Sequence, residues 1–221
     1  MKKNLLALAL ISTMTGAWAQ TAGSWLIQGN ITQITPKVSS GHLTAPSPAG
    51  TTVDVGSDTQ PTVQVTYMVN DNIALAVPLG LGFQHKLHGT GSISGTGQIG
   101  TVTSLPLTVF GQYRMGLADA TFRPYGLLGL SYARFQDAQG SAALNGLNPI
   151  NPVGGQTGLK VDSKLAPSLG FGMSYKLNDR WFVDTSYAKT FLKTTTTLST
   201  GQTIQTTLNP DMLTLGVGMR Y

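Results

Sequence analysis

The side chains of this chain that could do chemistry are three histidines and a few arginines and aspartates. His42, His85 and His88 fall in polar stretches, and the His85-x-x-His88 spacing would let two imidazoles share a metal ion. Two ligands in a loop make a poor metal site, and none of the histidines has an obvious acid partner. We therefore expect no catalytic residue, no metal and no cofactor, and an enzyme at the rim of the molecule is the least favoured interpretation.

The elements that must position the charged residues alternate with a period of two. From Ile73 to Phe83 the odd positions are bulky and apolar, whereas the even positions are Ala, Pro and Gly. Because successive side chains of a strand point to opposite faces, this pattern predicts strands with one apolar face. Eight such segments begin near Ser24, Asp58, Asn72, Ser104, Phe122, Lys164, Arg180 and Leu208.

Short and long connections alternate between these segments. The short ones are 70–71, 116–121 and 178–179, and the long polar ones are roughly 36–57, 85–103, 136–162 and 193–207. One end of the molecule therefore has turns and the other has large loops. This layout predicts an all-β fold, an eight-stranded antiparallel transmembrane β-barrel with short periplasmic turns and long extracellular loops.

The residue types on the second face of the predicted strands distinguish a membrane barrel from a soluble one. A soluble lipocalin-like barrel would carry Lys and Glu on its outer face, but only 10% of the 221 residues are charged, against about 25% in soluble domains. Small Gly, Ala, Ser and Thr residues suit a narrow lumen, and the bulky apolar face suits lipid. Lys189 is the exception on the apolar face, where we expect it to snorkel at the outer rim. An aromatic girdle is predicted near the turns, formed by Tyr67, Tyr113, Tyr175, Trp181 and Tyr221.

Composition excludes several other classes. The longest uninterrupted apolar run is Leu5 to Ile11, too short for a membrane helix of about 18 residues or more. With no cysteine, the chain is neither a disulfide-stapled domain nor a Cys-type zinc protein. The 14 basic residues are scattered singly, so we expect no nucleic-acid partner despite the net charge of +5.

The first residues are predicted to be an export signal. Two lysines precede the apolar run, and Ala17-Trp18-Ala19 fits the small-x-small cleavage pattern. We expect residues 1–19 to be a signal peptide and 20–221 to be the outer-membrane barrel.

The end of the chain and three internal stretches carry a family resemblance. The alternating segment Leu213-x-Leu215-x-Val217-x-Met219-x-Tyr221 resembles the assembly signal of bacterial outer-membrane proteins. The chain as a whole resembles the OmpW family in 66–73 continuing to 83–87, in Leu105-Pro106 followed by Phe122-Arg123-Pro124-Tyr125, and in 162–163 leading to Tyr175 and Asn178-Asp179-Arg180-Trp181. The resemblance implies an eight-stranded outer-membrane barrel that passes or binds small hydrophobic molecules and releases them sideways into the membrane. Outer-membrane lipid and the barrel assembly machinery, engaged through the strand ending at Tyr221, are the partners expected.

Charged residues at the alternating strand positions that should face the lumen predict a closed floor at the turn end. They are Arg114, Arg123, Lys176, Asp184 and Arg220. Because unpaired buried charge is costly, we expect Asp184 to pair with one of the three arginines and the network mainly to fill and stiffen the periplasmic half.

Apolar residues on the same parity predict a binding site above that floor. Phe110, Leu127 and Phe182 are expected to form an apolar cup toward the loop end. Pro78 and Pro106 lack a backbone donor and therefore predict a gap between strands through which a ligand could leave. The Asn, Gly and Pro content of 136–162 argues against an apolar plug built from that loop.

Two interpretations of function follow from this interior. The favoured one is a barrel that binds or passes small hydrophobic molecules. The alternative is a structural or surface-interaction barrel, of the receptor or adhesion type, whose packed lumen is inert.

Overall fold

The computed structural model describes residues 20–147, 150–151 and 155–221, and the predicted signal peptide, 1–19, lies outside them. In the described part of the chain, no helix has the length and apolarity needed to cross a bilayer. The elements are β1 (Trp25–Thr35), β2 (Ser39–Ser40), β3 (Thr51–Val55), β4 (Asp58–Met68), β5 (Ile73–Gly80), β6 (Phe83–Gly91), β7 (Gln98–Arg114), β8 (Phe122–Gly140), α1 (Ala142–Asn145), β9 (Leu159–Val161), β10 (Lys164–Lys176), β11 (Trp181–Thr190), β12 (Lys193–Leu198), β13 (Thr203–Thr207) and β14 (Asp211–Arg220).

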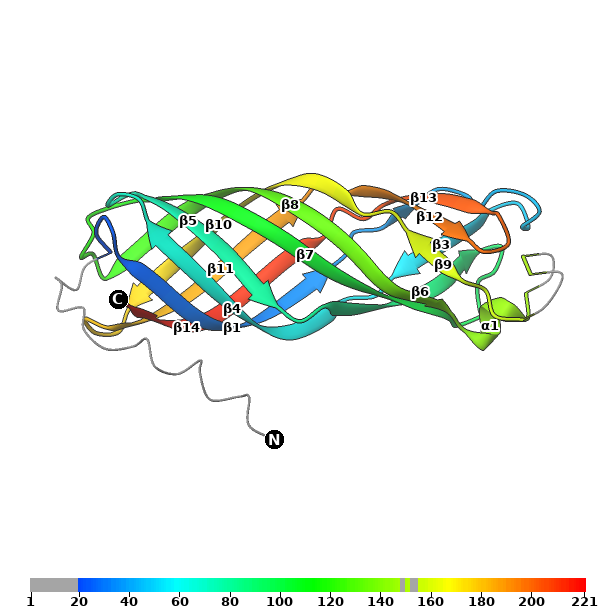
Figure 1. The fold of residues 1–221 in the computed structure, drawn as a ribbon, viewed down its shortest axis with the longest axis horizontal. Coiled ribbons are helices and arrows are strands. Elements are labelled where there is room, and N and C mark those ends of the chain that lie inside the picture. The colour runs from blue at the N-terminus through cyan, green and yellow to red at the C-terminus, as the bar shows by residue number, and fades with distance from the viewer. Residues whose placement is uncertain (1–19, 148–149, 152–154) are drawn as a thin grey trace, which may run out of the picture.

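The long strands close into an eight-stranded antiparallel barrel, as predicted. Around the barrel the order is β1, β4, β5, β7, β8, β10, β11 and β14, and β14 pairs with β1 to close the circle. After a break at Leu81 and Gly82, β6 continues the course of β5 and also pairs with β7. Figure 1 shows the C-terminus and the short turns at one end of this barrel and the long extensions at the other.

The loop end is more regular than the sequence suggests. β7 has 17 residues and β8 has 19, although about 9–11 are enough to cross a membrane. The connection 193–207 contains a hairpin of β12 and β13, and these strands join β2 and β9 in a second sheet. Parts of all four predicted long loops are therefore strands. Their many Thr residues favour extended backbone, which explains why polar connections pair in this way.

The two faces of the barrel follow the predicted alternation, with one correction. Leu75 is 48% exposed while Ala74 and Ala76 are fully buried, and the same contrast recurs along β10 and β14. Phe83 was predicted to lie on the outer apolar face but is only 4% exposed. The break between β5 and β6 shifts the parity by one residue, and this shift also turns His85 inward.

Aromatic and charged residues mark the two edges of the exposed apolar band. The five predicted girdle residues are all at least one-third exposed and lie toward the turn end. At the opposite edge Lys189 is paired with Asp211 on the neighbouring strand, at 2.8 Å, and the Tyr187 hydroxyl donates to the same carboxylate at 2.8 Å. We take the band between these edges as the membrane-spanning part of the barrel.

Placing a charge in this band should test its depth. Leu215 is 60% exposed and lies midway along β14. Leu215→Arg is expected to lower the free energy of unfolding by about 2–4 kcal/mol, as for a charge at the bilayer midplane. Leu177→Arg, in the turn beyond the girdle, should cost no more than about 1 kcal/mol. Urea titration in lipid vesicles measures both values, and equal losses would contradict the assignment of the band.

Candidate functional site

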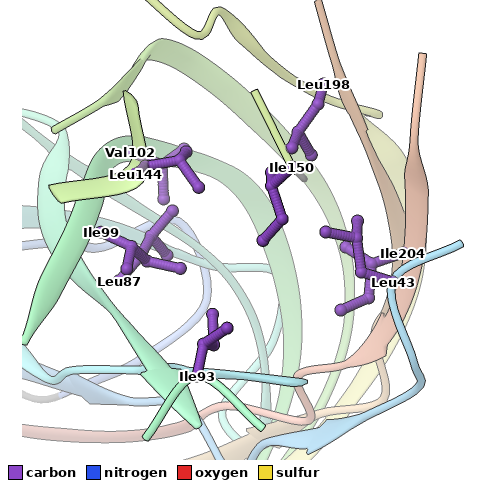
Figure 2. Close-up of a cluster of buried hydrophobic side chains, with 9 residues drawn as sticks. All are labelled: Leu43, Leu87, Ile93, Ile99, Val102, Leu144, Ile150, Leu198 and Ile204. Carbon is purple, nitrogen blue, oxygen red and sulfur yellow. The ribbon is translucent and has the colours of Figure 1, made fainter. Parts of the chain in front are cut away.

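An apolar cluster fills the loop end of the molecule. In Figure 2 its side chains are arranged around the inner face of the strands and point toward a common interior. The nine buried members are Leu43, Leu87, Ile93, Ile99, Val102, Leu144, Ile150, Leu198 and Ile204. Most are single bulky residues in otherwise polar stretches, so periodicity, which needs several such residues in register, gave no sign of them.

Two members of the cluster correct the expectation for the loop 136–162. Leu144, on α1, is 3% exposed and Ile150 is fully buried, so this loop does supply apolar side chains to the interior. Hydrogen bonds hold both in place: the Leu144 amide donates to the Ser141 hydroxyl at 3.4 Å, and the Gln202 side-chain amide donates to the Ile150 carbonyl at 2.9 Å. The polar residues of this region thus position the apolar ones.

The cluster encloses the upper part of a cavity of about 130 Å³. This is comparable to a cavity of roughly 150 Å³ that binds benzene when lined by aliphatic and aromatic residues. Phe110 and Met212 line it from the barrel side. Among the described residues that line the cavity there is no Asp, Glu, Lys or Arg. An uncharged apolar molecule therefore fits this lining, whereas a charged group would find no ionic partner in it.

A row of hydroxyl groups crosses the barrel side of the cavity. Thr108 on β7 bonds to Ser131 on β8 at 2.8 Å, and Ser131 bonds to Ser168 on β10 at 2.9 Å. Ser168 then bonds to Thr190 on β11 at 2.7 Å. We call these four residues the hydroxyl row. Thr108 and Ser168 alternate with the exposed apolar residues of β7 and β10, but the sequence did not indicate that hydroxyls from four strands are joined.

His85 lies above the membrane-spanning band and lines the same cavity. Its partner on β7 is Val102. Val102 lies farther toward the loop end than Leu105, which pairs with exposed Arg134 on β8. The Nδ1 of His85 lies 2.8 Å from the Gly56 carbonyl, which can only accept, so Nδ1 carries a proton. Nε2 lies 3.0 Å from the Ser104 hydroxyl and accepts from it in the neutral ring. Burial lowers the pKa of His85 below its usual value, against the opposing effects of the Gly56 carbonyl and nearby Asp58.

A charged network closes the turn end. Arg114 and Asp184 are 2% and 1% exposed, and their nearest charged atoms are 3.8 Å apart. The Tyr125 hydroxyl donates to Asp184 at 2.6 Å, and the Arg114 guanidinium lies over the Tyr125 ring at 4.5 Å. Arg114 also donates to Gln112 at 2.9 Å and to the Ser174 hydroxyl at 2.8 Å. Of the arginines considered, Arg114 is thus the one the structure places against Asp184.

The other predicted floor residues have different partners. Arg123 donates to the Gln20 side chain at 3.0 Å and to the Asp71 carbonyl at 2.6 Å. Arg220 lies over the Phe182 ring, at 5.8 Å. Lys176 is outside this network and forms an ion pair with Asp179 in the adjoining turn, at 2.7 Å.

Gln20 and Tyr125 are floor residues that sequence reasoning missed. Gln20 is the first described residue and is 1% exposed; nothing in the strand pattern reaches it. Tyr125 shares the parity of Arg123 and Leu127, so extending the alternation along β8 would have placed it inside the barrel.

The three apolar residues predicted to form a cup lie at different depths. Phe110 packs with Ala76, Tyr125, Leu127 and Ala188 and lines the base of the cavity. Leu127 belongs to this packed cluster but is not part of the cavity lining. Phe182 lies in a separate cluster with Leu26, Met68 and Ala74, and also lies outside the lining. Of the three, Phe110 therefore reaches the cavity, and the cup above it is built from the extensions.

Pro78 and Pro106 lie at an interruption in the barrel wall. β5 pairs with β7 from Ile73 to Ala76, and β6 takes up the pairing with β7 at Phe83. Between these ladders, residues 77–82 face 105–109, and the described structure has no backbone pairing between these two segments, although each is paired with the strand on its other side. A small cavity of about 30 Å³ at this place is lined by both prolines. It also reaches lumenal Thr108 and lipid-exposed Leu79 and Leu81, so it lies between the interior and the membrane face.

The three histidines do not meet in one site. His42 is exposed, His88 is half-buried in the pair with β3, and His85 is held by Gly56 and Ser104. Within the described ranges, no group of three or more His, Asp or Glu is close enough to hold a metal ion.

A closed eight-stranded barrel with an outward apolar band defines the class of protein as an outer-membrane β-barrel. The OmpW family matches residues 21–221, and the chain belongs to this family. It is 30% identical over 227 residues to outer membrane protein W of Vibrio cholerae, covering all of both chains. It is likewise 30% identical over 224 residues to outer membrane protein W of Escherichia coli, covering 100% of this chain and 99% of the other.

The solved structures show the same fold. The outer membrane protein OprG from Pseudomonas aeruginosa superposes with a TM-score of 0.82 and 22% identity, over 93% of this chain and 99% of the other. The family and these barrels place the chain in the outer membrane, among porin-like proteins that are not enzymes.

Separating the buried ion pair should weaken the barrel strongly. Arg114→Met leaves Asp184 buried without its cation, and we expect a loss of about 3–5 kcal/mol in the free energy of unfolding. Arg114→Met combined with Asp184→Leu removes both charges and should recover at least half of that loss. Urea unfolding in lipid vesicles, followed by tryptophan fluorescence, gives both values. Additive losses in the double variant would show that the two residues do not act as a pair.

The protonation of His85 should make the extension sensitive to acid. Because the folded pKa is lower than the unfolded value of about 6.5, neutral His85 contributes its full stability above that pH. This contribution is lost as the pH falls through the folded pKa. A histidine NMR titration should give a midpoint below 6.5, and His85→Gln should remove this part of the pH dependence of unfolding. A midpoint at or above 6.5 would contradict the burial described for the ring.

Proposed function

We propose that this barrel takes up small uncharged hydrophobic molecules from the extracellular side and releases them sideways into the outer membrane. The observation that carries the proposal is the apolar cavity, which is partly surrounded by the extensions and has no charged side chain in its described lining. Burial of apolar surface in such a cavity is favourable without any specific polar contact.

The floor favours a lateral route over passage along the barrel axis. Arg114, Asp184 and Tyr125 fill the turn end together with buried Gln112 and Ser174. An apolar molecule moving down the axis would have to separate these bonded polar groups. This costs free energy, because the molecule cannot form hydrogen bonds to replace those that are broken. Eight strands also leave an interior only wide enough for side chains or one small ligand.

The interrupted seam between β5 and β7 supports the exit. Backbone groups inside lipid normally pair with neighbouring strands, so an unpaired stretch of wall is exceptional. Pro78 and Pro106 have no N–H to leave unsatisfied, which makes the interruption less costly. The small cavity at this seam shares Pro106, Thr108 and Met212 with the larger one. The two cavities therefore adjoin, and the second leads toward Leu79 and Leu81 on the lipid side.

The alternative is a surface-interaction barrel with an inert, packed lumen. Its support is the lower half of the barrel, where Phe182, Leu26 and Met68 pack together at the turn ends of their strands. The cavity in the upper half is unfavourable for that alternative, because an inert lumen has no need of enclosed apolar space.

The same proposal includes two further partners. Outer-membrane lipid would cover the exposed apolar face of the barrel, and the barrel assembly machinery would engage β14 and Tyr221. The alternating exposed residues of β14 support both.

Closing the seam should block release. The chain has no cysteine, so Leu79→Cys with Leu107→Cys introduces two thiols on opposite sides of the interruption, at side chains about half exposed. Bridging them with a bifunctional maleimide should reduce the entry of a hydrophobic dye such as N-phenyl-1-naphthylamine into intact cells to the level without the protein. Dye fluorescence measures the rate.

The control pair is Ile31→Cys with Leu215→Cys, which face each other across the paired seam of β1 and β14. Bridging this pair should leave dye entry unchanged. Unchanged entry after bridging Leu79→Cys and Leu107→Cys would exclude this exit, and equal uptake of a polar sugar and the dye would exclude the proposed function itself.

A further inference from the structure

The hydroxyl row contains one more proton than its internal bonds use. Its four hydroxyls are joined by three hydrogen bonds, of 2.8, 2.9 and 2.7 Å. Each bond takes one proton, so one O–H remains at one end of the row and a free acceptor at the other. The bonds have no fixed direction, because a hydroxyl both donates and accepts. The spare donor can therefore lie at Thr108 or at Thr190.

Both ends of the row face the cavity. Thr108, Ser131 and Thr190 are among the residues that line it, whereas Ser168 is 1% exposed and lies behind them. No further side-chain hydrogen bond of the Thr108 or Thr190 hydroxyl is present in the described structure. The nearby polar pair of His85 and Ser104 is different, because both ring nitrogens of His85 already have partners. On the barrel side of the cavity, the spare donor thus belongs to the row.

The opposite part of the cavity is mainly apolar, although Thr194, Thr196 and Thr206 of β12 and β13 also line it. The nine-residue apolar cluster lies there, and it contains aliphatic side chains alone. The cavity therefore has two chemically different ends, one that can bond a single small polar group and one that can cover a hydrocarbon tail.

We propose that the hydroxyl row is the subsite for the polar head of an uncharged, single-headed amphiphile, for which a primary alkanol is the simplest example. The tail would lie in the apolar cluster. This inference rests on the proposed function and narrows its substrate class. An alkanol hydroxyl can accept from the spare donor at one end of the row or donate to the free acceptor at the other end, whichever way the row runs. A carboxylate would be buried without a cation, and an alkane would leave the spare donor unsatisfied.

Thr108 also connects the row to the proposed exit. It lines both the main cavity and the small cavity at the seam. A second set of hydroxyls begins there, with Thr62 bonded to Thr32 at 2.7 Å and Thr32 to Thr214 at 3.2 Å. A polar head leaving the row would therefore meet further hydroxyl partners on its way to the membrane.

The test compares 1-octanol with octane in the barrel reconstituted in lipid nanodiscs. Methyl NMR reads both ends of the cavity, since Ile99 and Ile150 report the tail and Thr108 and Thr190 the head. Octane should shift the isoleucine methyls alone, whereas 1-octanol should shift both sets. Thr108→Val with Thr190→Val keeps the shape of both end side chains, and Ser131→Ala in the same protein removes the remaining row hydroxyl that lines the cavity. The ratio of 1-octanol to octane affinity should fall roughly fivefold, the effect of one ordinary hydrogen bond.

Thr185→Val is the matched control, because this residue points away from the lumen and bonds the Thr214 carbonyl. It should leave the ratio unchanged, and heat-dependent gel mobility verifies that all variants are folded. If wild type binds both molecules but the triple variant keeps the ratio, the head subsite is refuted while the proposed function stands. If neither molecule shifts the isoleucine methyls in wild type, the proposed function itself fails.

Discussion

Backbone hydrogen bonding in lipid is the constraint on which the rest of this structure depends. A bilayer offers no water to an unpaired N–H or C=O, so a sheet that crosses it must close. The chain meets this demand with eight paired strands, and within its described residues the pairing is interrupted between β5 and β7. Pro78 and Pro106 sit at that place, where a missing donor is an advantage. Because the rest of the wall must stay paired, an opening to lipid can form only where lost pairing costs little.

Closure also separates the interior into two chemical zones. The lower zone is filled by paired charge and packed apolar residues, including Arg114, Asp184 and Phe182. The upper zone contains more kinds of side chain, because apolar loop residues, hydroxyl groups and His85 line the same cavity. The boundary between them lies near Phe110. A barrel too narrow for a water-filled pore can therefore still hold a molecule, provided that the walls are extended beyond the membrane.

The sequence predicted the barrel well because alternation is repeated in every strand. It predicted Asp184 with an arginine because two isolated buried charges must pair. It did not predict the apolar cluster, since residues such as Leu144 and Ile150 are single apolar positions whose partners lie far along the chain. It misplaced Phe83 because a two-residue break in a strand reverses parity, and no local pattern marks such a break. The hydroxyl row was also invisible, because Ser and Thr on a lumenal face look the same whether or not they meet.

The seam between β1 and β14 has a kinetic consequence. Trp25 and Tyr221 exchange two backbone hydrogen bonds there, each of 2.8 Å, although they come from opposite ends of the barrel sequence. The last strand to be synthesised, β14, must pair with the first, β1. The barrel stays open until this pairing forms, even if all the hairpins between them are already in place. Such long-range contacts slow folding. Until β14 arrives, β1 is an open edge that can pair with another chain, so the time spent in that state sets the risk of misassembly.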